Sequence, residues 1–502
     1  MTPGAEGYFE EHRESGDLGR QALRGGIVSV AMQYGNGLLQ ILAAVVLARL
    51  LTPADFGLVA IITVLTSFAP LLIDFGLGDA TTQRKKITPG QVSSLFWLSS
   101  GVGLAVAVVL AGASPLIATI YREPQLEPIA LCTSVTFVLW GISNQHLALL
   151  RRTMRFGRIA RIQLLGSLVG IVVAIVMAIA GCGYWALVAR PIANAGCVAI
   201  GAWLGCHWRP GRPLFDDETK AMIRFGLHVV GFSVTYTIAK AVDRIALGLF
   251  YKPDQVGYYQ NAITLYESSI FQALAQVHTV GSAALSKLQS NVAALVLKYQ
   301  SALSALAFFV MPAAAILSVT GEDVTVILLG ERWRAAGALL RIIALRGIPQ
   351  VVEGSQGWLH LSIGRADRWR NWGVVSLGVQ IVAVLSGLPF GATGVAVAWV
   401  IAGVAIAVPS VVYAGRPIGV GAAIVVRAVG PQAIGAIAAV ASGTWLQMVL
   451  MANWPSVVRI LASASICTCV YLGVVVGLFR RSEPLKLARS LVRDRLRRKH
   501  QA

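Results

Sequence analysis

The sequence predicts an all-α membrane protein that crosses the bilayer about fourteen times. Of its 502 residues, 56% are hydrophobic and only 13% are charged, whereas soluble domains carry about 25% charged residues. The mean hydropathy is +0.70. A bilayer core about 30 Å thick requires roughly 20 apolar residues per spanning helix, and fourteen segments of that length follow one another along the chain. This composition excludes a soluble globular domain and a disordered chain.

The spanning segments fall into three groups. After a cytoplasmic N-terminal segment, 1–25, six of them form an expected N-lobe over 26–205, at 26–50, 56–76, 92–113, 127–150, 160–180 and 183–205. Beyond a cytoplasmic inter-lobe linker, 206–221, six more form a C-lobe over 222–414, at 222–250, 255–282, 300–319, 335–362, 372–389 and 392–414. Two extra helices over 424–479, at 424–450 and 457–479, precede a basic cytoplasmic tail, 480–502.

The basic residues support this count independently. The net charge is +19, from 42 Lys and Arg against 23 Asp and Glu. With fourteen helices and both termini in the cytoplasm, 31 of the 42 basic residues fall on the cytoplasmic side, six in exterior loops and five within helices. That is the bias of the positive-inside rule. The excess therefore indicates topology and contact with anionic lipid, and it gives no reason to expect nucleic acid.

An internal repeat relates the two lobes. A shift of 200 residues aligns 24–66 with 224–266 without a gap and with seven identities. Pro53 then meets Pro253 and Gly57 meets Gly257, and such residues mark helix ends. Because the shift spans six helices, an even number, we expect a parallel repeat with the substrate site between the lobes.

The first and seventh segments carry polar faces in the same phase. Gln33, Asn36 and Gln40 share one side of a helix, and the shift places on them Ser233, Tyr236 and Lys240. These faces are expected to line a cavity between the lobes. The alternative is hydrogen bonding between helices, which is common for such residues in membranes. The charges of Lys240, Asp243 and Arg244 favour a cavity, because charges at membrane depth are costly.

The tenth segment adds Arg346, Gln350 and Glu353 on one face, with Arg341 about 140° from Arg346 around the helix. Cationic residues at this depth suit a phosphate or pyrophosphate, and amides and hydroxyls suit sugars. Arg190, directly before Pro191, fits a helix break or a lipid head group as well as a substrate contact. Four carboxylates lie in or near the predicted helices: Asp74, Asp243, Glu267 and Glu353. They could carry a coupling proton or Na⁺. Alternatively, they could be neutralised by internal ion pairs, for example Asp243 by Lys240.

No sequence motif points to an enzyme. The chain has no phosphate-binding GxxxxGK[ST], no GxSxG, no HExxH and no CxxC pair. The six cysteines are scattered and fit buried, inert thiols, so no metal and no cofactor is expected. The longest exterior loops, 114–126 and 320–334, offer few carboxylates for catalysis, among them Glu123, Glu322 and Asp323.

Two stretches carry a family resemblance. GGIVSVAMQYGNGLLQILAAVVLARLLTPADFGLVAIITVLTSFAPLLIDFGLGDA resembles the first two helices of polysaccharide-biosynthesis flippases. AVDRIALGLFYKPDQVGYYQNAITL is similar to the entry to their second lobe. These proteins belong to the multidrug/oligosaccharidyl-lipid/polysaccharide exporter superfamily. The resemblance implies a bilobed transporter that works by alternating access without ATP and moves an undecaprenyl-pyrophosphate-linked oligosaccharide between the leaflets of the bacterial inner membrane.

The resemblance also implies which residues face the substrate. Mapped onto this chain, the cavity helices are the first, second, seventh and eighth, which adds Tyr259 and Glu267 to the polar faces described above. The expected substrate-binding set is Gln33, Asn36, Gln40, Ser233, Tyr236, Lys240, Arg244, Tyr259, Arg341, Arg346 and Gln350.

Expected partners are a lipid-linked oligosaccharide, membrane lipid, a proton or Na⁺, and proteins of the polymerisation or export machinery, for exopolysaccharide, capsule or O-antigen synthesis. Two alternatives stay open. An ion-coupled drug or metabolite antiporter of the same superfamily would favour an acidic cavity. A membrane glycan polymerase or ligase would need larger exterior loops.

Overall fold

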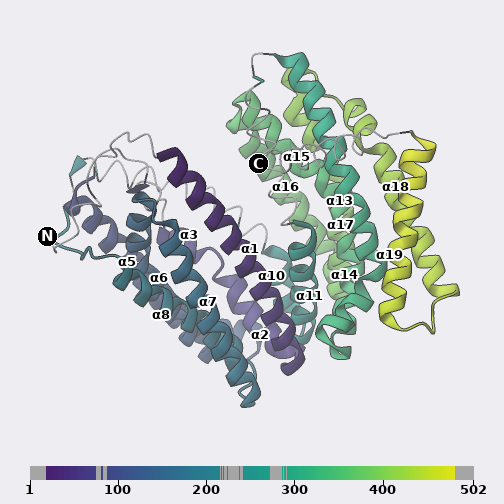
Figure 1. Ribbon diagram of the computed structural model, residues 1–502. Coiled ribbons are helices and arrows are strands. Elements are labelled where there is room, and N and C mark those ends of the chain that lie inside the picture. Colours follow the sequence, from purple (N-terminus) through teal and green to yellow (C-terminus); the bar gives the residue numbers. More distant parts are fainter. Residues whose placement is uncertain are drawn as a thin grey trace, which may run out of the picture. The chain divides into compact units, whose positions relative to one another are not determined.

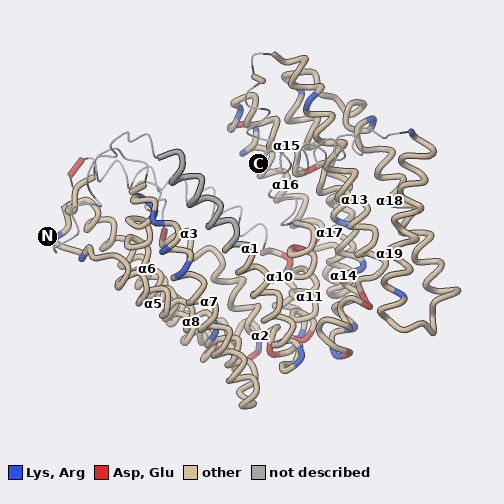
Figure 2. The backbone as a smooth tube through the Cα atoms, viewed as in Figure 1, with Lys and Arg blue, Asp and Glu red and all other residues tan. Residues whose placement is uncertain are grey.

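The computed structural model describes residues 18–74, 87–214, 241–271 and 291–480, with a few positions between these ranges. Every regular element in this part of the chain is helical (Figure 1). Among these residues, nine helical stretches are long and apolar enough to cross a membrane, or ten if one bent pair counts as a span. Charged residues are sparse along them (Figure 2). The predicted all-α polytopic membrane fold is confirmed.

Contacts divide the chain into two compact units, Met1–Gly257 and Tyr258–Ala502. The first contains α1 (Leu18–Leu50), α2 (Pro53–Leu65), α3 (Ala69–Asp74), α5 (Pro89–Tyr121), α6 (Leu126–Arg152), α7 (Phe156–Ile179), α8 (Trp185–Gly205) and α10 (Val242–Phe250). Here α5 packs on α6, α7 on α8, α1 on α7 and α10 on α2. Leu95, Leu149 and Trp208 belong to a buried cluster that joins α5 and α6 to the segment after α8. Apolar packing therefore fixes α6 and α8, which position the polar residues described below.

The second unit follows the first turn of α11 (Pro253–Tyr266). It contains the π-helix η2 (Glu267–Phe271), α13 (Val292–Leu329), the 3₁₀ turn η3 (Glu331–Trp333), α14 (Arg334–Ala344), α15 (Gly347–Ile363), α16 (Ala366–Gly387), η4 (Leu388–Phe390), α17 (Gly391–Gly415), η5 (Arg416–Ile418), α18 (Ala422–Val449), α19 (Ser456–Leu472) and the π-helix η6 (Gly473–Leu478). Helix α13 contacts α14, α15, α18 and α19, and α17 contacts α15 and α16. The long α13 is thus the element that joins the last two helices to the rest of this unit.

Two helices begin with the same local signal. Thr52 and Thr88 each precede a proline, and each hydroxyl accepts a hydrogen bond from the backbone N–H three residues later, at 3.3 Å for Asp55 and 3.2 Å for Gln91. The side chains of Asp55 and Gln91 accept from the threonine N–H in return. These capping boxes satisfy backbone donors that a helix start leaves open, which explains why α2 and α5 begin where they do.

Helix ends follow the 200-residue shift seen in the sequence. Helix α1 ends at Leu50 and α10 at Phe250, while α2 begins at Pro53 and α11 at Pro253. Within the first unit, Gly57 lies against the carbonyl oxygen of Pro253, and Gly257 lies against that of Pro53. A Cβ atom at either glycine would overlap the facing oxygen. The repeat-related positions therefore meet in a reciprocal contact that only glycine permits.

The predicted segments correspond to observed helices with shifted ends. The segment 300–319 is part of the longer α13, and 335–362 is divided into two helices, Glu331–Ala344 and Gly347–Ile363, bent by 52°. The segments 222–250 and 255–282 extend beyond the described residues, so the count of fourteen spans stays a prediction. The predicted linker 206–221 does not coincide with the boundary between the two compact units, which lies at Gly257. The boundary falls later in the chain because α10 packs on α2 of the first unit.

Candidate functional site

In the first unit, Gln40 of α1 connects two neighbouring helices. Arg190 of α8 donates a hydrogen bond to the Gln40 side-chain oxygen, and the Gln40 amide lies 3.5 Å from the Ser167 hydroxyl of α7. Helix α8 continues through Pro191, so Arg190 does not mark a helix break. Gln40 is thus a link between helices and a partner for the partly buried cationic side chain of Arg190.

A cavity of about 440 Å³ with a mixed polar and apolar lining lies in the same unit. Asn36 and Asp74, both predicted site residues, line it together with Asn144 of α6. The Asn144 amide donates to an Asp74 carboxylate oxygen at 3.0 Å, and the Gly78 N–H donates to the same oxygen at 3.3 Å. The carboxylate of Asp74 is therefore held in place at the wall of the cavity.

Asp243 and Arg244, at the start of α10, interact with each other. The Arg244 side chain lies 3.4 Å from the Asp243 carboxylate, which also accepts from the Arg244 N–H at 2.8 Å. Asp243 is buried and Tyr259 of α11 is fully buried, whereas Glu267 is exposed. The side chain of Gln33 and residues Ser233, Tyr236 and Lys240 lie outside the described residues.

The second unit contains a buried group on α15. Arg346, which immediately precedes α15 and is 4% exposed, forms an ion pair with Glu353. Its guanidinium lies 5.4 Å from the centre of the Trp399 ring of α17. Gln350, between the two charges in sequence, accepts a hydrogen bond from Tyr266. The predicted stripe of Arg346, Gln350 and Glu353 is thus one connected group.

Arg346 keeps hydrogen-bonding capacity beyond its ion pair. Its Nε and Nη1 atoms are buried and make no hydrogen bond in the described part of the chain. Burying such donors without a partner is costly. A phosphate or carboxylate matches the fork of a guanidinium and would satisfy such donors. The group can therefore hold an anion if its ion pair opens.

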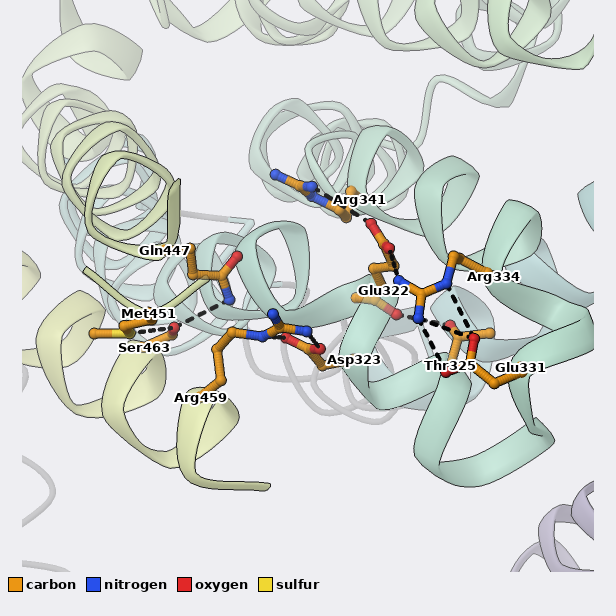
Figure 3. Close-up of polar contacts among 11 residues, drawn as sticks. Glu322, Asp323, Thr325, Glu331, Arg334, Arg341, Gln447, Met451, Arg459 and Ser463 are labelled. Carbon is orange, nitrogen blue, oxygen red and sulfur yellow. Dashed lines mark hydrogen bonds and ion pairs between the residues drawn. The ribbon is translucent and has the colours of Figure 1, made fainter. Parts of the chain in front are cut away.

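Arg341 belongs to a different group from Arg346, because it lies on α14, and the chain bends by 52° between α14 and α15. Its side chain donates to the Ser318 carbonyl oxygen at 3.3 Å and lies 3.7 Å from Glu322, which also pairs with Arg334 at 2.7 Å. In Figure 3, Glu322 lies between the two arginines. Arg341 is thus placed among contacts of α13 and α14, apart from Arg346 and Gln350.

Glu322 and Asp323, expected in the exterior loop 320–334, lie within α13 instead, because this helix continues to Leu329, and both are engaged in ion pairs. Asp323, 5% exposed, accepts from the Arg459 Nε atom at 2.7 Å and from a second nitrogen of the same guanidinium. Figure 3 shows Arg459 reaching Asp323 from α19. This pair ties α19 to α13.

Several contacts could not be found from the sequence. Asn144 is 70 residues from Asp74, and Tyr266 is 84 residues from Gln350. Trp399 lies in an apolar run and carries no signal of its role. Within the described residues, no group of three or more His, Cys, Asp or Glu side chains could hold a metal ion.

Comparisons with known proteins agree on one family. The sequence model of a family described as "Polysaccharide biosynthesis protein" matches residues 46–337. The chain is 25% identical over 375 residues to the lipopolysaccharide biosynthesis protein WzxC of Escherichia coli (strain K12), covering 73% of this chain and 75% of WzxC. It is also 25% identical to the teichuronic acid biosynthesis protein TuaB of Bacillus subtilis (strain 168), covering 73% and 76%.

Solved structures show the same fold at lower identity. The lipid II flippase MurJ, in an inward closed conformation, matches with a TM-score of 0.70 at 15% identity, over 90% of this chain and 99% of that chain. A multidrug resistance MATE family transporter of the MOP superfamily, in an inward-facing conformation, matches with a TM-score of 0.56 at 14% identity, over 78% and 98%. The described helices thus follow a fold that two groups of transporters share.

Proposed function

The chain belongs to the polysaccharide biosynthesis protein family, and from this premise we propose that it flips lipid-linked oligosaccharide repeat units across a bacterial inner membrane. The chain is a multi-pass membrane transport protein of polysaccharide biosynthesis, similar to WzxC. The proposal adds the cargo, an undecaprenyl-pyrophosphate-linked oligosaccharide, and the mechanism, alternating access without ATP. The flipped oligosaccharide would serve exopolysaccharide, capsule or O-antigen synthesis.

One observation supports an anionic cargo above the others. Arg346 is buried, carries a single ion pair and leaves two nitrogens without hydrogen bonds in the described residues. A buried cation with free donors suits a phosphate or pyrophosphate. Arg190, which donates to Gln40, would supply a second cationic side chain, in the first unit. The two charges fit a polyprenyl pyrophosphate better than they fit a cationic drug.

The proposal includes the arrangement that the sequence predicts. Fourteen spans form two six-helix lobes related by the parallel repeat, with two extra helices after them and both termini in the cytoplasm. The positive-inside bias of the basic residues supports this orientation. Gln33, Ser233 and Tyr236 are proposed to line the path of the sugars, and Lys240 to hold the pyrophosphate. Asp74, Asp243, Glu267 and Glu353 are proposed to include the group that couples transport to a proton or Na⁺.

The test is a deletion in the native host followed by extraction of lipid-linked intermediates. We expect the complete oligosaccharide to accumulate on its carrier in the cytoplasmic leaflet while polymer is lost. Single repeat units that reach the periplasm and stay unpolymerised would refute flipping and favour a polymerase. Normal polymer output in the deletion strain would refute both the flippase and the polymerase function.

Point variants separate substrate contact from loss of protein. Lys240→Ala and Arg244→Ala should reduce export at normal membrane levels, because each removes a charge from a predicted polar face. Arg427→Ala is the matched control, since Arg427 is an exposed arginine on α18. Unchanged polymer output in both test variants would remove these two residues from the substrate path.

A further inference from the structure

The cavity of the first unit differs in chemistry from the arginine sites. Asn36, Asp74, Trp140, Ser143, Asn144 and Asn194 are among the residues that line it, and no Lys or Arg is among its lining residues in the described part of the chain. The Arg151 guanidinium lies beside Gly78, close to Asp74, but it is not among the lining residues. A pyrophosphate in the cavity would meet the Asp74 carboxylate at its wall, and this carboxylate would repel it. The cavity is therefore not built for the charged end of a lipid-linked glycan.

Its size argues against a single bound cation. At about 440 Å³, the cavity falls within the range of roughly 300–1,000 Å³ that is typical of small organic ligands. One water molecule occupies about 30 Å³, so the space holds the equivalent of many waters. A lone Na⁺ or proton would leave most of it filled with solvent. The volume fits a ring-sized molecule.

The lining offers the mixed donors and acceptors that hydroxyl groups require. Asparagine amides both donate and accept, and three of them, Asn36, Asn144 and Asn194, meet here. The Asn36 side-chain oxygen is buried without a hydrogen-bond partner in the described residues. The Asn144 side-chain nitrogen donates a hydrogen bond to Asp74 at 3.0 Å. The Asn144 side-chain oxygen can accept a hydrogen bond from a ligand hydroxyl. A hydroxylated ligand would satisfy these groups, whereas an apolar drug would not.

An aromatic side chain completes the pattern. Trp140 of α6 lines the same cavity, and an indole presents an apolar face next to its polar N–H. A sugar ring has a C–H face and a hydroxyl edge, so it matches an aromatic wall with amides around it.

The position of the cavity along the membrane follows from α6. Asn144 lies eight residues before the end of α6, about 12 Å along the helix, on the side that the topology predicts to be cytoplasmic.

We propose that this cavity binds one uncharged sugar residue, a neutral hexose or an N-acetylhexosamine, of the transported glycan. The proposal rests on the proposed function and adds where a sugar is bound and which class is selected. The Asp74 carboxylate accepts hydrogen bonds from hydroxyls and disfavours a uronic acid at this position.

The test measures binding of simple glycosides to the purified full-length protein by intrinsic tryptophan fluorescence. The probes are methyl glucoside, methyl N-acetylglucosaminide and methyl glucuronide, with Trp140→Phe used to identify the signal. At least one neutral glycoside should bind about tenfold more tightly than the glucuronide. Asn144→Ala should weaken that binding about tenfold, the effect of one lost hydrogen bond to a ligand, and Asp74→Asn should reduce the preference against the glucuronide.

A matched control and a fallback keep the test decisive. Gln447→Ala removes an amide that bonds to Ser463 at 3.1 Å in the second unit and should leave glycoside binding unchanged. If Asn144→Ala does not fold, Gln163→Ala serves in its place, because Gln163 lines the cavity and is exposed.

Three results would overturn the proposal. They are equal or tighter binding of the glucuronide, a response to Na⁺ with none to any glycoside, and binding that neither cavity variant weakens. The flippase proposal fails on different grounds. If the deletion strain exports normally while the purified protein still binds the neutral glycoside, the cavity proposal survives as a sugar site and flipping is refuted.

Discussion

Replacing Glu353 by Gln should destabilise the second unit more than replacing Arg346 by Met. Arg346 is 4% exposed, and the Glu353 side chain is 16% exposed. A guanidinium cannot lose its proton in a protein, whereas a carboxyl group can take one up when its partner is lost. Glu353→Gln therefore leaves a permanent buried charge, while Arg346→Met leaves a group that can become neutral.

The magnitude follows from the burial of this pair. Breaking a buried pair by removing one partner costs about 3–5 kcal/mol. We expect the lower end, about 3 kcal/mol, for Glu353→Gln, because the partly exposed carboxylate is incompletely desolvated. For a unit of this size each kcal/mol lowers the melting temperature by about 2 °C or more, so a fall of about 6 °C is expected. The double variant should recover most of it, since neutral side chains can replace a buried pair at little cost.

The assay is thermal unfolding of the purified protein in detergent for both single variants and the double variant. A double-mutant cycle isolates the coupling between the two side chains. Losses that simply add in the double variant would refute the reasoning, because they would mean that the two charges do not stabilise each other. Equal losses in the two single variants would refute the argument from protonation.

Two further changes test packing in each unit by the same unfolding assay. Arg459→Leu should lower stability by about 2 kcal/mol, because the buried Asp323 loses its partner. This is less than for Glu353→Gln, because the side chain left behind is a carboxyl and not a permanently charged guanidinium. Arg334→Ala, whose side chain is 53% exposed, should cost at most about 1 kcal/mol. Equal losses would contradict the difference in burial. Gly57→Ala should lower stability by about 1–3 kcal/mol, because the added Cβ atom overlaps a backbone carbonyl. The control is Gly112→Ala, which should be neutral or stabilising because there is open space around Gly112. A harmless Gly57→Ala would refute the reciprocal contact.

The sequence determined the fold class and most helix positions. A spanning helix requires an apolar run of fixed minimum length, and that run is visible without any knowledge of neighbours. The prolines at 53 and 253 marked two helix boundaries, because a proline acts within a single turn of chain; the structure shows that α2 and α11 begin at these prolines themselves. Helix periodicity also grouped Arg346, Gln350 and Glu353 on one face, whereas Arg341 is separated from them by a helix break that periodicity did not reveal.

Only the tertiary structure decided what each polar face meets. Gln40 and Arg190 are 150 residues apart in the sequence, so no local pattern connects them. The same holds for Asp74 and Asn144, whose contact places a carboxylate at the wall of a cavity that the sequence did not reveal. Periodicity fixes the side of a helix from which a residue points, but its partner depends on which helix packs there. That choice depends on the packing of many side chains at once, and so belongs to the folded chain.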